Sequence, residues 1–336
     1  MRIVITGATS FVGAATVREL LGRGHTVFAV VRPGSGKLDC ITKENEQALA
    51  NGRLFVVEND LNEPERLLTV LPDLVGSTAI CDVFCHFGWG GSGSGSRTDE
   101  ALQKKNCEVT LGTMRTAKKL GCRRFLFSGS QAEYGLHRAL ITEESLCEPR
   151  SLYGAAKLSV RRDGERLCRE LGMQYIHTRI FSAYGPGDHP WTLVESALDA
   201  FLEDRELALG ACTQLWNFLY IKDLARAMAA LMEVPEKDLE DLGNPVFNLA
   251  GEETRVLRDF VEEIHALCNG RGSCRYNTRQ ENAEGLINLN PSIEKLETVT
   301  GWRPETDFKA GIEALLRGRK EGRKEAETNK VLTNMK

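Results

Sequence analysis

The chain has 336 residues, of which 42% are hydrophobic and 27% charged, and its formal net charge at pH 7 is −4. This length and composition predict one large or two smaller folded cores and exclude disorder of the whole chain. The slightly acidic balance and the lack of an uninterrupted apolar run of about 18 residues argue against nucleic acid and membranes as partners. We therefore expect a cytoplasmic protein whose partner is a small molecule.

The ten cysteines are scattered, with no CxxC pair and no cluster of cysteine and histidine at zinc spacing. Such a pattern predicts reduced thiols that serve as small apolar side chains, and no metal site.

Over the first 180 residues, short apolar runs alternate with helical patterns. Strands are expected at 2–6 (RIVIT), 26–31 (TVFAVV), 53–59 (RLFVVEN), 81–88 (CDVFCHFG), 123–130 (RRFLFSGS) and 174–181 (QYIHTRIF), and helices at 12–23, 99–120 and 151–171. Runs of this kind separated by amphipathic helices predict βαβ units. The expected fold class is α/β, with a doubly wound parallel sheet covered on both faces.

Beyond residue 180 the helical patterns shorten and mix with strand candidates at 216–221 and 245–250. We predict a first domain over 1–180 and a smaller mixed α/β lobe over 181–316, partly interwoven with the first. The charged stretch 317–336 contains few apolar residues and predicts a solvated helix or disorder. The glycine- and serine-rich stretch 90–96 follows a strand and is interpreted as a mobile active-site loop.

The first predicted strand runs into residues 6–13, TGATSFVG, which have the layout of a dinucleotide-binding loop. Gly7 allows the tight turn after the strand, and Gly13 allows the next helix to pack closely. Ser10 replaces the usual middle glycine and can donate to a phosphate at the helix N-terminus. The loop favours a Rossmann-type NAD(P) domain, and a tight turn without a ligand is the alternative.

The end of the second strand bears on which dinucleotide is bound. NAD-binding domains usually carry Asp or Glu about 20 residues after the loop, where it binds the adenine ribose. Here the strand ends in Val31 and Arg32, and an arginine can pair with a 2′-phosphate. We therefore expect NADP(H) rather than NAD(H), unless Arg32 stacks on the adenine or lies in solvent. Asp60 can accept from the adenine amino group or cap a helix.

The sequence YGAAK places Tyr153 and Lys157 one helical turn apart. An ammonium at this distance lowers the pKa of a phenol, which can then exchange a proton with a sugar hydroxyl near neutral pH. Ser128 and Ser130 end the preceding strand, where they can hydrogen-bond the reacting oxygen. Such a Tyr/Lys pair is common on helix surfaces, so its interpretation depends on the rest of the chain.

The motifs of the whole chain occur in an order that resembles the extended short-chain dehydrogenase/reductase family, the NAD(P)-dependent nucleotide-sugar epimerases, dehydratases and ketoreductases. The resemblance extends from about Met1 to Leu316 and includes TGxxxFxG, HFGW, SxSxxxYG, YxxxK, RIFSAYGPG, NFLYIKDLA and TGWRPETDFKAGI. It implies that Tyr153 is the acid/base, Lys157 its partner and Ser130 the hydrogen-bonding hydroxyl. It also implies a homodimer formed through the helices at 99–120 and 151–171.

The residues expected to bind the cofactor come from the loop analysis and from this resemblance. They are Gly7, Ser10, Phe11, Val12, Gly13, Arg32, Asp60, Leu61, Phe87, Gly88, Asn106, Ser128, Tyr153, Lys157 and Phe181. The expected substrate is a nucleotide sugar, and its candidate ligands are Trp89, Ser130, Ser182, Trp216 and Arg279. Trp216 stands where relatives carry an arginine that contacts the nucleotide diphosphate, which opens the possibility of a different substrate.

Two further departures bear on the reaction. Sugar dehydratases of the family carry a Thr-Asp-Glu triplet where this chain has Ser130-Gln131-Ala132, which argues against 4,6-dehydration. The arginine at position 32 favours exchangeable NADP(H), and hence 4-keto-sugar reduction slightly over 4-epimerisation with captive NAD. A non-catalytic NADP-binding regulatory protein is the least expected alternative, because such a protein does not need Ser130, Tyr153 and Lys157 together.

Overall fold

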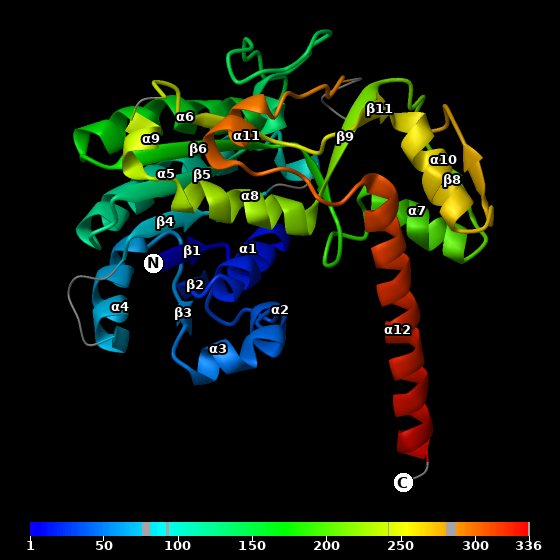
Figure 1. Ribbon diagram of the computed structural model, residues 1–336, viewed down its shortest axis with the longest axis horizontal. Helices are drawn as coiled ribbons and strands as arrows, with labels where there is room; N and C mark the ends of the chain where they lie inside the picture. Colours follow the sequence, from blue (N-terminus) through cyan, green and yellow to red (C-terminus); the bar gives the residue numbers. More distant parts are fainter. Residues whose placement is uncertain (76–80, 92–93, 241, 280–286, 335–336) are drawn as a thin grey trace.

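The computed structural model describes residues 1–75, 81–91, 94–240, 242–279 and 287–334. Its centre is a seven-stranded sheet in the order β10-β6-β5-β4-β1-β2-β3, in which every neighbouring pair is parallel. The strands are β1 (Arg2–Thr6), β2 (Thr26–Val31), β3 (Leu54–Glu58), β4 (Val83–His86), β5 (Arg124–Ser130), β6 (Gln174–Ile180) and β10 (Val246–Leu249). This confirms the predicted α/β fold class (Figure 1).

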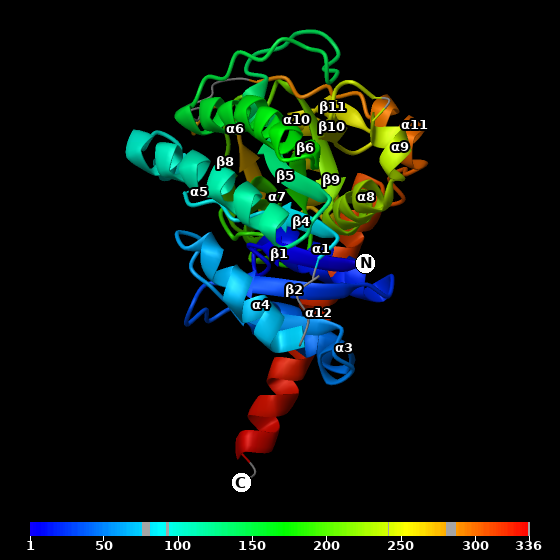
Figure 2. The same ribbon diagram turned by 90° about the vertical axis from the view of Figure 1, so that its left-hand side faces the viewer.

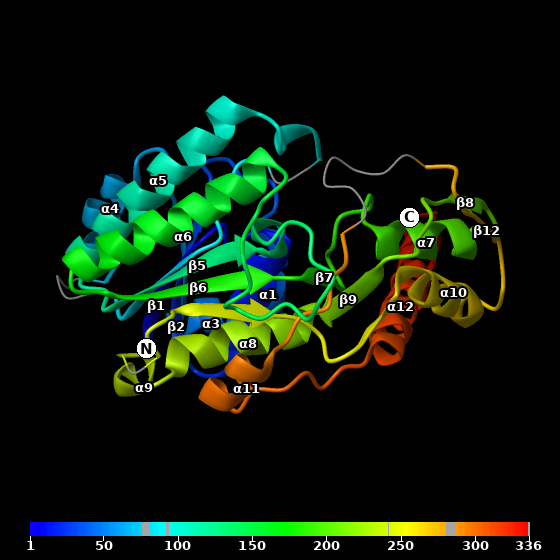
Figure 3. The same cartoon turned by 90° about the horizontal axis from the view of Figure 1, so that it is seen from above.

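Helices cover both faces of the sheet, because alternate residues of each strand are apolar and point to opposite sides. Ile3 and Ile5 of β1 belong to the core shared with one helix layer, and Val4 belongs to the core on the other side. The first layer holds α1 (Phe11–Gly22), α8 (Ile221–Glu233) and α11 (Glu294–Thr300). The second holds α4 (Leu67–Val75), α5 (Glu100–Lys119) and α6 (Leu152–Glu170), as Figure 3 shows.

Short helices fill the connections. They are α2 (Asp39–Thr42), α3 (Glu46–Ala50) and α9 (Glu236–Glu240), with the 3₁₀ turns η1 (Lys43–Asn45), η2 (Pro64–Arg66), η3 (Ser94–Ser96) and η4 (Gln131–Glu133).

A smaller lobe packs at the carboxyl end of the large sheet. It contains the sheet β11-β9-β7 and the parallel pair β12-β8. Its elements are β7 (Ser182–Tyr184), β8 (Glu206–Ala208), β9 (Leu215–Tyr220), β11 (Thr254–Val256), β12 (Ser273–Arg275), α7 (Leu193–Leu202), α10 (Leu257–Leu267) and α12 (Phe308–Asn334). Aromatic side chains dominate its core, where Phe308 stacks on Phe218 and Tyr184 and Phe260 meet the same ring edge-on.

The two lobes are interwoven in sequence. Helix α8 packs on α1, and strand β10 pairs with β6. Both elements are therefore part of the larger lobe, although their residues fall within the range 181–316 that we predicted for the smaller lobe. The physical reason is that β10 is buried along its whole length, as an added strand of a helix-covered parallel sheet must be.

The charged C-terminal stretch is helical as far as Asn334, where we had allowed for disorder. Helix α12 leaves the body of the protein, as Figures 1 and 2 show. Its Arg319 forms ion pairs with Glu195 and Asp199 of α7, which anchor the middle of the helix. Among the residues that the structure describes, no helix is both long and apolar enough to cross a lipid bilayer.

A buried arginine fastens the end of α8 to the sheet. Arg124, at the start of β5, is 5% exposed and donates to the carbonyls of Met232 at 2.5 Å and Val234 at 2.7 Å. It also donates to Gln174 Oε1 at 2.8 Å. The carbonyls at a helix C-terminus lack intrahelical donors, so Arg124 satisfies groups that would otherwise be buried unpaired.

We expect Arg124→Met to lower the free energy of unfolding by about 2–4 kcal/mol, because two or more buried acceptors lose their donor. The neighbouring Arg123→Met is the matched control: Arg123 is exposed and pairs with Asp82 and Glu236, so its loss should cost less than about 1 kcal/mol. Urea denaturation of both variants measures the difference. Equal costs for the two variants would contradict the capping role.

Candidate active site

A pocket of about 900 Å³ opens at the carboxyl ends of the central strands. This is the edge at which doubly wound sheets bind their ligands. The predicted cofactor and substrate residues that line it are Gly7, Ser10, Phe11, Arg32, Asp60, Leu61, Phe87, Gly88, Trp89 and Asn106. Other predicted residues, among them Ser128, Ser130, Tyr153 and Lys157, are not part of its lining.

The first strand and the first helix build a cradle for a phosphate group. Gly7 has φ +65°, and a Cβ atom there would lie 2.8 Å from the Gly88 nitrogen. Ser10 caps α1 by accepting the Gly13 N–H at 3.0 Å, so the helix begins at the pocket wall. A side chain at Gly7 would meet the backbone of Phe87 and Gly88, so glycine lets the two loops approach closely beside the helix N-terminus, where a phosphate binds favourably. This cradle fits the pyrophosphate of a dinucleotide, whereas Val12 and Gly13 are not part of the pocket lining.

The basic side chains near the end of β2 are accompanied by acids. Arg32 is exposed at the pocket edge. Nearby, Arg18 pairs with Glu44 at 2.5 Å and Lys43 pairs with Asp39 at 2.7 Å. These two ion pairs do not involve Arg32, on which our choice of NADP(H) depended, and an exposed arginine can serve as well beside a ribose or an adenine.

The loop after β4 is held against α5. Asn106 accepts from the Gly90 N–H at 3.0 Å and donates to the Gly90 carbonyl at 2.8 Å, while Trp89 donates to Gln103 Oε1 at 3.0 Å. Of the stretch 90–96 that we predicted as a mobile loop, residues 92 and 93 lie outside the described residues. Asn106 therefore fixes the pocket wall by both of its amide atoms.

Tyr153 and Lys157 lie on the buried face of α6. Ser151 caps the helix by accepting the Gly154 N–H at 3.1 Å. A Cβ atom at Gly154 would lie 2.4 Å from the Ala132 carbonyl oxygen, so only glycine lets α6 approach the turn that follows β5. This close approach brings the phenol and the ammonium toward the end of β5.

The Lys157 ammonium is buried between a carbonyl and aromatic rings. Its Nζ donates to the Ser128 carbonyl at 2.6 Å and lies 3.9 Å from the centre of the Trp89 ring and 4.6 Å from that of Phe127. Burial lowers the pKa of Lys157 to about 7. Trp89 also meets the Tyr153 ring edge-on at 6.2 Å. The structure thus places Trp89 between the pocket and the Tyr/Lys pair.

Ser130 ends β5 and begins the η4 turn. Its Oγ accepts the Ala132 N–H at 3.2 Å, and its own N–H donates to Glu133 Oε1 at 2.8 Å, which completes a capping box. Because Oγ already accepts, its proton is available to donate to a bound oxygen.

The predicted residues of the substrate side are not brought together by contacts among the described residues. Ser182 begins β7, whereas Phe181, predicted to bind the cofactor, is buried beside Tyr134 in a cluster against which Trp216 packs. Trp216 packs on Phe218, and no described residue pairs with its indole N–H. Arg279 is exposed and adjoins residues 280–286, which lie outside the described ranges. Their roles in substrate binding stay predictions.

Sequence reasoning missed one wall of the pocket. Residues 186–190, Pro-Gly-Asp-His-Pro, follow β7 and line it from the side of the smaller lobe. The glycine- and proline-rich turn signal was visible, but the sequence does not show that this turn folds back over the first loop.

Comparison with known proteins places these features in a family. Residues 3–250 match the NAD dependent epimerase/dehydratase family. The chain belongs to this family. It is therefore an enzyme of the extended short-chain dehydrogenase type, as the order of its motifs predicted.

Relatives cover nearly the whole chain at low identity. The uncharacterized UDP-glucose epimerase YtcB of Bacillus subtilis is 24% identical, over 93% of this chain and 96% of its own length. UDP-glucuronic acid decarboxylase 1 of Arabidopsis thaliana is 26% identical, over 93% of this chain and 68% of its own.

Several solved structures have the same fold as this chain. UDP-glucuronic acid 4-epimerase from Bacillus cereus, in complex with UDP-glucuronic acid and NAD, has a TM-score of 0.76 and 22% identity, with 94% of this chain and 97% of that one covered. The dTDP-glucose 4,6-dehydratase DesIV from Streptomyces venezuelae, with NAD and TYD bound, has a TM-score of 0.80 and 21% identity, with coverage of 96% and 98%.

The comparisons correct our choice of cofactor. The family is described as NAD dependent, and the similar structures hold NAD. The expectation of NADP(H), drawn from Arg32, is wrong. An arginine at the end of β2 permits a 2′-phosphate but does not require one.

Proposed function

We propose that this enzyme binds NAD in the pocket and transfers a hydride to and from C4 of a nucleotide-activated sugar, with 4-epimerisation as the net reaction. The observation that carries the proposal is the buried Lys157 ammonium, one helical turn from Tyr153 and bonded to the Ser128 carbonyl at 2.6 Å; Trp89, which it contacts, lines the pocket that holds the dinucleotide cradle. The names of the relatives, which are epimerases and decarboxylases of UDP-sugars, support a nucleotide sugar as the substrate.

The roles of the side chains follow from their chemistry. NAD, when bound, supplies the group that takes up and returns the hydride. Tyr153 accepts the proton of the sugar hydroxyl as its carbon is oxidised and returns it on reduction. Lys157 favours the phenolate by its positive charge, and Ser130 donates its free proton to the same sugar oxygen.

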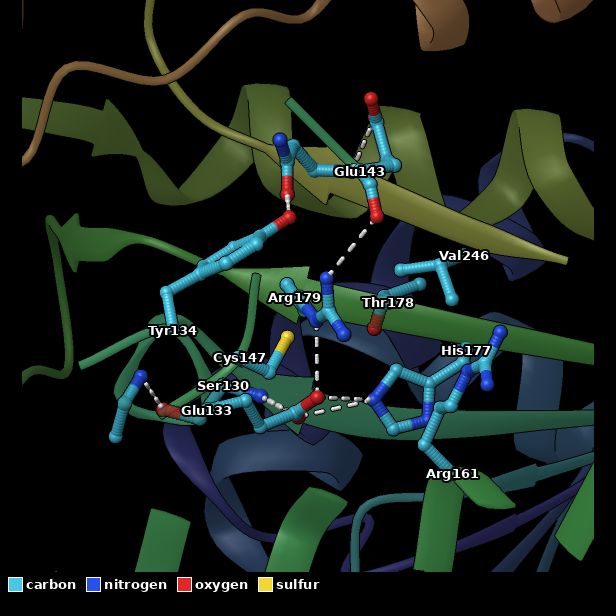
Figure 4. Close-up of polar contacts among 12 residues, drawn as sticks. Ser130, Glu133, Tyr134, Glu143, Cys147, Arg161, His177, Thr178, Arg179 and Val246 are labelled. Atoms are coloured by element: carbon cyan, nitrogen blue, oxygen red, sulfur yellow. Dashed lines mark hydrogen bonds and ion pairs between the residues drawn. The ribbon is translucent and has the colours of Figure 1, made fainter. Parts of the chain in front are cut away.

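Two observations favour epimerisation over the other family reactions. The carboxylate that follows Ser130-Gln131-Ala132, Glu133, points into the core toward His177, as Figure 4 shows, so it cannot supply the acid of a dehydratase. Our preference for keto-sugar reduction depended on NADP(H) as the cofactor, and it is withdrawn because the comparisons point to NAD. Residues of both lobes line the pocket, which supports a cofactor that stays bound through turnover.

The test is to purify the protein without added cofactor, denature it and identify the released nucleotide by mass spectrometry. UDP-glucose, UDP-galactose and UDP-glucuronic acid are then supplied without NAD, and their C4 epimers are measured. Stoichiometric NAD with epimer formation is the expected result. NAD that exchanges freely, with turnover only of a 4-keto sugar, would instead indicate a reductase. A protein that neither contains nor binds NAD would contradict the proposal.

For the assembly we propose a homodimer through α5 and α6. These helices pack side by side on the outer surface, as Figures 2 and 3 show, and Leu152 at the start of α6 is 42% exposed. Light scattering that gives twice the chain mass of 37.2 kDa would support it, and a monomer would contradict it. The cytoplasmic location stays a prediction.

A further inference from the structure

A buried polar cluster lies directly beneath Ser130. Glu133 follows Ser130 in the η4 turn, and Tyr175, His177 and Arg179 are alternate residues of β6 that face it. Glu133 and His177 are fully buried, and Arg179 is 2% exposed. Figure 4 shows the carboxylate of Glu133 between His177 and Arg179, with the Ser130 backbone on its remaining side.

Each oxygen of Glu133 is held by donors. Oε1 accepts the Ser130 N–H at 2.8 Å and His177 Nε2 at 2.9 Å, and Oε2 accepts Arg179 Nε at 2.9 Å. The Tyr175 hydroxyl lies 3.0 Å from His177 Nδ1, so it donates there while Nε2–H donates to the carboxylate. One chain of hydrogen bonds thus runs from β6 to the backbone of Ser130.

The cluster keeps Glu133 ionised. Burial opposes ionisation, but His177, Arg179 and the Ser130 N–H together lower the pKa of Glu133 to about 2. Burial lowers the pKa of His177, so the imidazole is neutral and Arg179 carries the compensating charge. An ionised carboxylate in this position is the strongest acceptor available for the Ser130 N–H.

The chain makes room for this arrangement at Gly129, between the two serines. A Cβ atom there would lie 2.3 Å from His177 Nε2 and 2.5 Å from Glu133 Oε1. The sequence Ser128-Gly129-Ser130 therefore lets both side chains pass under the strand that carries the catalytic hydroxyl. Any other residue at position 129 would push the carboxylate away from the Ser130 backbone.

We propose that Glu133 is a positioning residue of this active site: its carboxylate, clamped by Arg179 and His177, fixes the Ser130 backbone so that the serine hydroxyl faces the substrate. The same carboxylate supplies a buried negative charge for the Lys157 ammonium. The expected kinetic effects of this proposal rest on the proposed function. The expected effect on hydrogen exchange rests on the hydrogen-bond network alone.

The groups around Lys157 define what a change of charge should do. Glu133 and Cys107 of α5 raise the pKa of Lys157, against the larger lowering by burial. His86 of β4 has a pKa lowered to about 3 by burial and is neutral, as is His177. Tyr153 lies on the same helix as Lys157, α6, with its ring centre 5.7 Å from the ammonium. Removal of the Glu133 charge should therefore lower the pKa of Lys157 further.

The test compares Glu133→Gln with Glu143→Gln in the full-length protein loaded with NAD. Glu143 is the matched control, because it is also buried and accepts a backbone N–H, that of Asn248 at 2.8 Å, but does not contact Ser130. A glutamine at 133 has one acceptor oxygen for three donors, so at least one bond is lost. Glu133→Asp keeps the negative charge on a side chain that is one methylene shorter. It replaces Glu133→Gln as the test variant if that variant does not fold.

Three readouts are taken, with whichever of UDP-glucose, UDP-galactose and UDP-glucuronic acid the wild type turns over. For Glu133→Gln we expect kcat to fall about tenfold or more while KM stays within about threefold. We expect the basic limb of the kcat profile to move to lower pH by about 0.5 unit or more. Glu133→Asp should keep this limb in place. Hydrogen exchange by mass spectrometry should show faster exchange over residues 128–134 in Glu133→Gln and not in Glu143→Gln.

The possible outcomes separate the two proposals. If the wild type turns over none of these sugars, the proposed substrate fails, and the exchange data still decide the role of Glu133. Equal kcat, pH profile and exchange in Glu133→Gln and Glu143→Gln would overturn the positioning role. So would an unfolded Glu133→Gln together with a Glu133→Asp whose exchange over 128–134 matches the wild type.

Discussion

Tyr153→Phe is expected to abolish turnover of the nucleotide sugar while the bound NAD is retained. The substitution removes only the hydroxyl that moves the proton, which should lower kcat by about 10²- to 10⁴-fold. The ring keeps its edge-on contact with Trp89 and its place under the Arg97 guanidinium, 4.8 Å from the ring centre. Steady-state rates and the NAD content of the purified variant check both halves of the expectation.

The matched control for this variant is Tyr184→Phe. Tyr184 is also a buried tyrosine, but its hydroxyl donates to the Phe308 carbonyl in the smaller lobe at 3.3 Å. Loss of that hydroxyl should affect stability and leave turnover within about threefold of the wild type. If Tyr153→Phe kept wild-type turnover, another group would have to be the acid/base.

Lys157→Met is expected to lower kcat by about 10²- to 10⁴-fold without lowering stability at neutral pH. Methionine removes the charge that favours the phenolate, yet it fills nearly the same apolar space between Trp89 and Phe127. Because the ammonium is buried at a cost, an uncharged side chain of similar shape should leave the free energy of unfolding equal or higher. Activity assays and urea denaturation of the NAD-free proteins measure the two effects.

The same variant tests the pKa of Lys157. Burial lowers this pKa from 10.5 to about 7 in the folded protein, so the unfolded chain binds more protons between these values. Wild-type stability should therefore rise with pH, relative to Lys157→Met, over about pH 7 to 9. A difference between the two proteins that does not change over this window would show that Lys157 is not titrating there.

The large sheet could be predicted because each of its first six strands carries a local signal, a short β-branched run between helical patterns. The place of β10 could not be predicted, because the mostly apolar residues of Val246–Leu249 suit a buried strand of either sheet. Only pairing with β6, far away in sequence, decides between them. The choice of cofactor failed because an exposed arginine at the end of β2 is compatible with a 2′-phosphate but does not require one.

The cluster under Ser130 left a signal that the sequence analysis did not use. Strand β6 is buried almost throughout, yet its alternate residues Tyr175, His177 and Arg179 are polar. Polar groups on one face of a buried strand require a partner, and a buried arginine requires an acid. Glu133 could have been sought on this ground, but the sequence alone does not show which carboxylate reaches that face.

The repeated passage of the chain between the two lobes limits how the protein can be divided. Because α8, β10 and α11 return to the large sheet after segments of the small lobe, no single cut releases either lobe with a complete core. A nicked or truncated chain should lose both lobes in one cooperative transition. Any motion that admits substrate must bend all the chain segments that join the two lobes. This favours a small displacement of the lobes over a large hinge rotation.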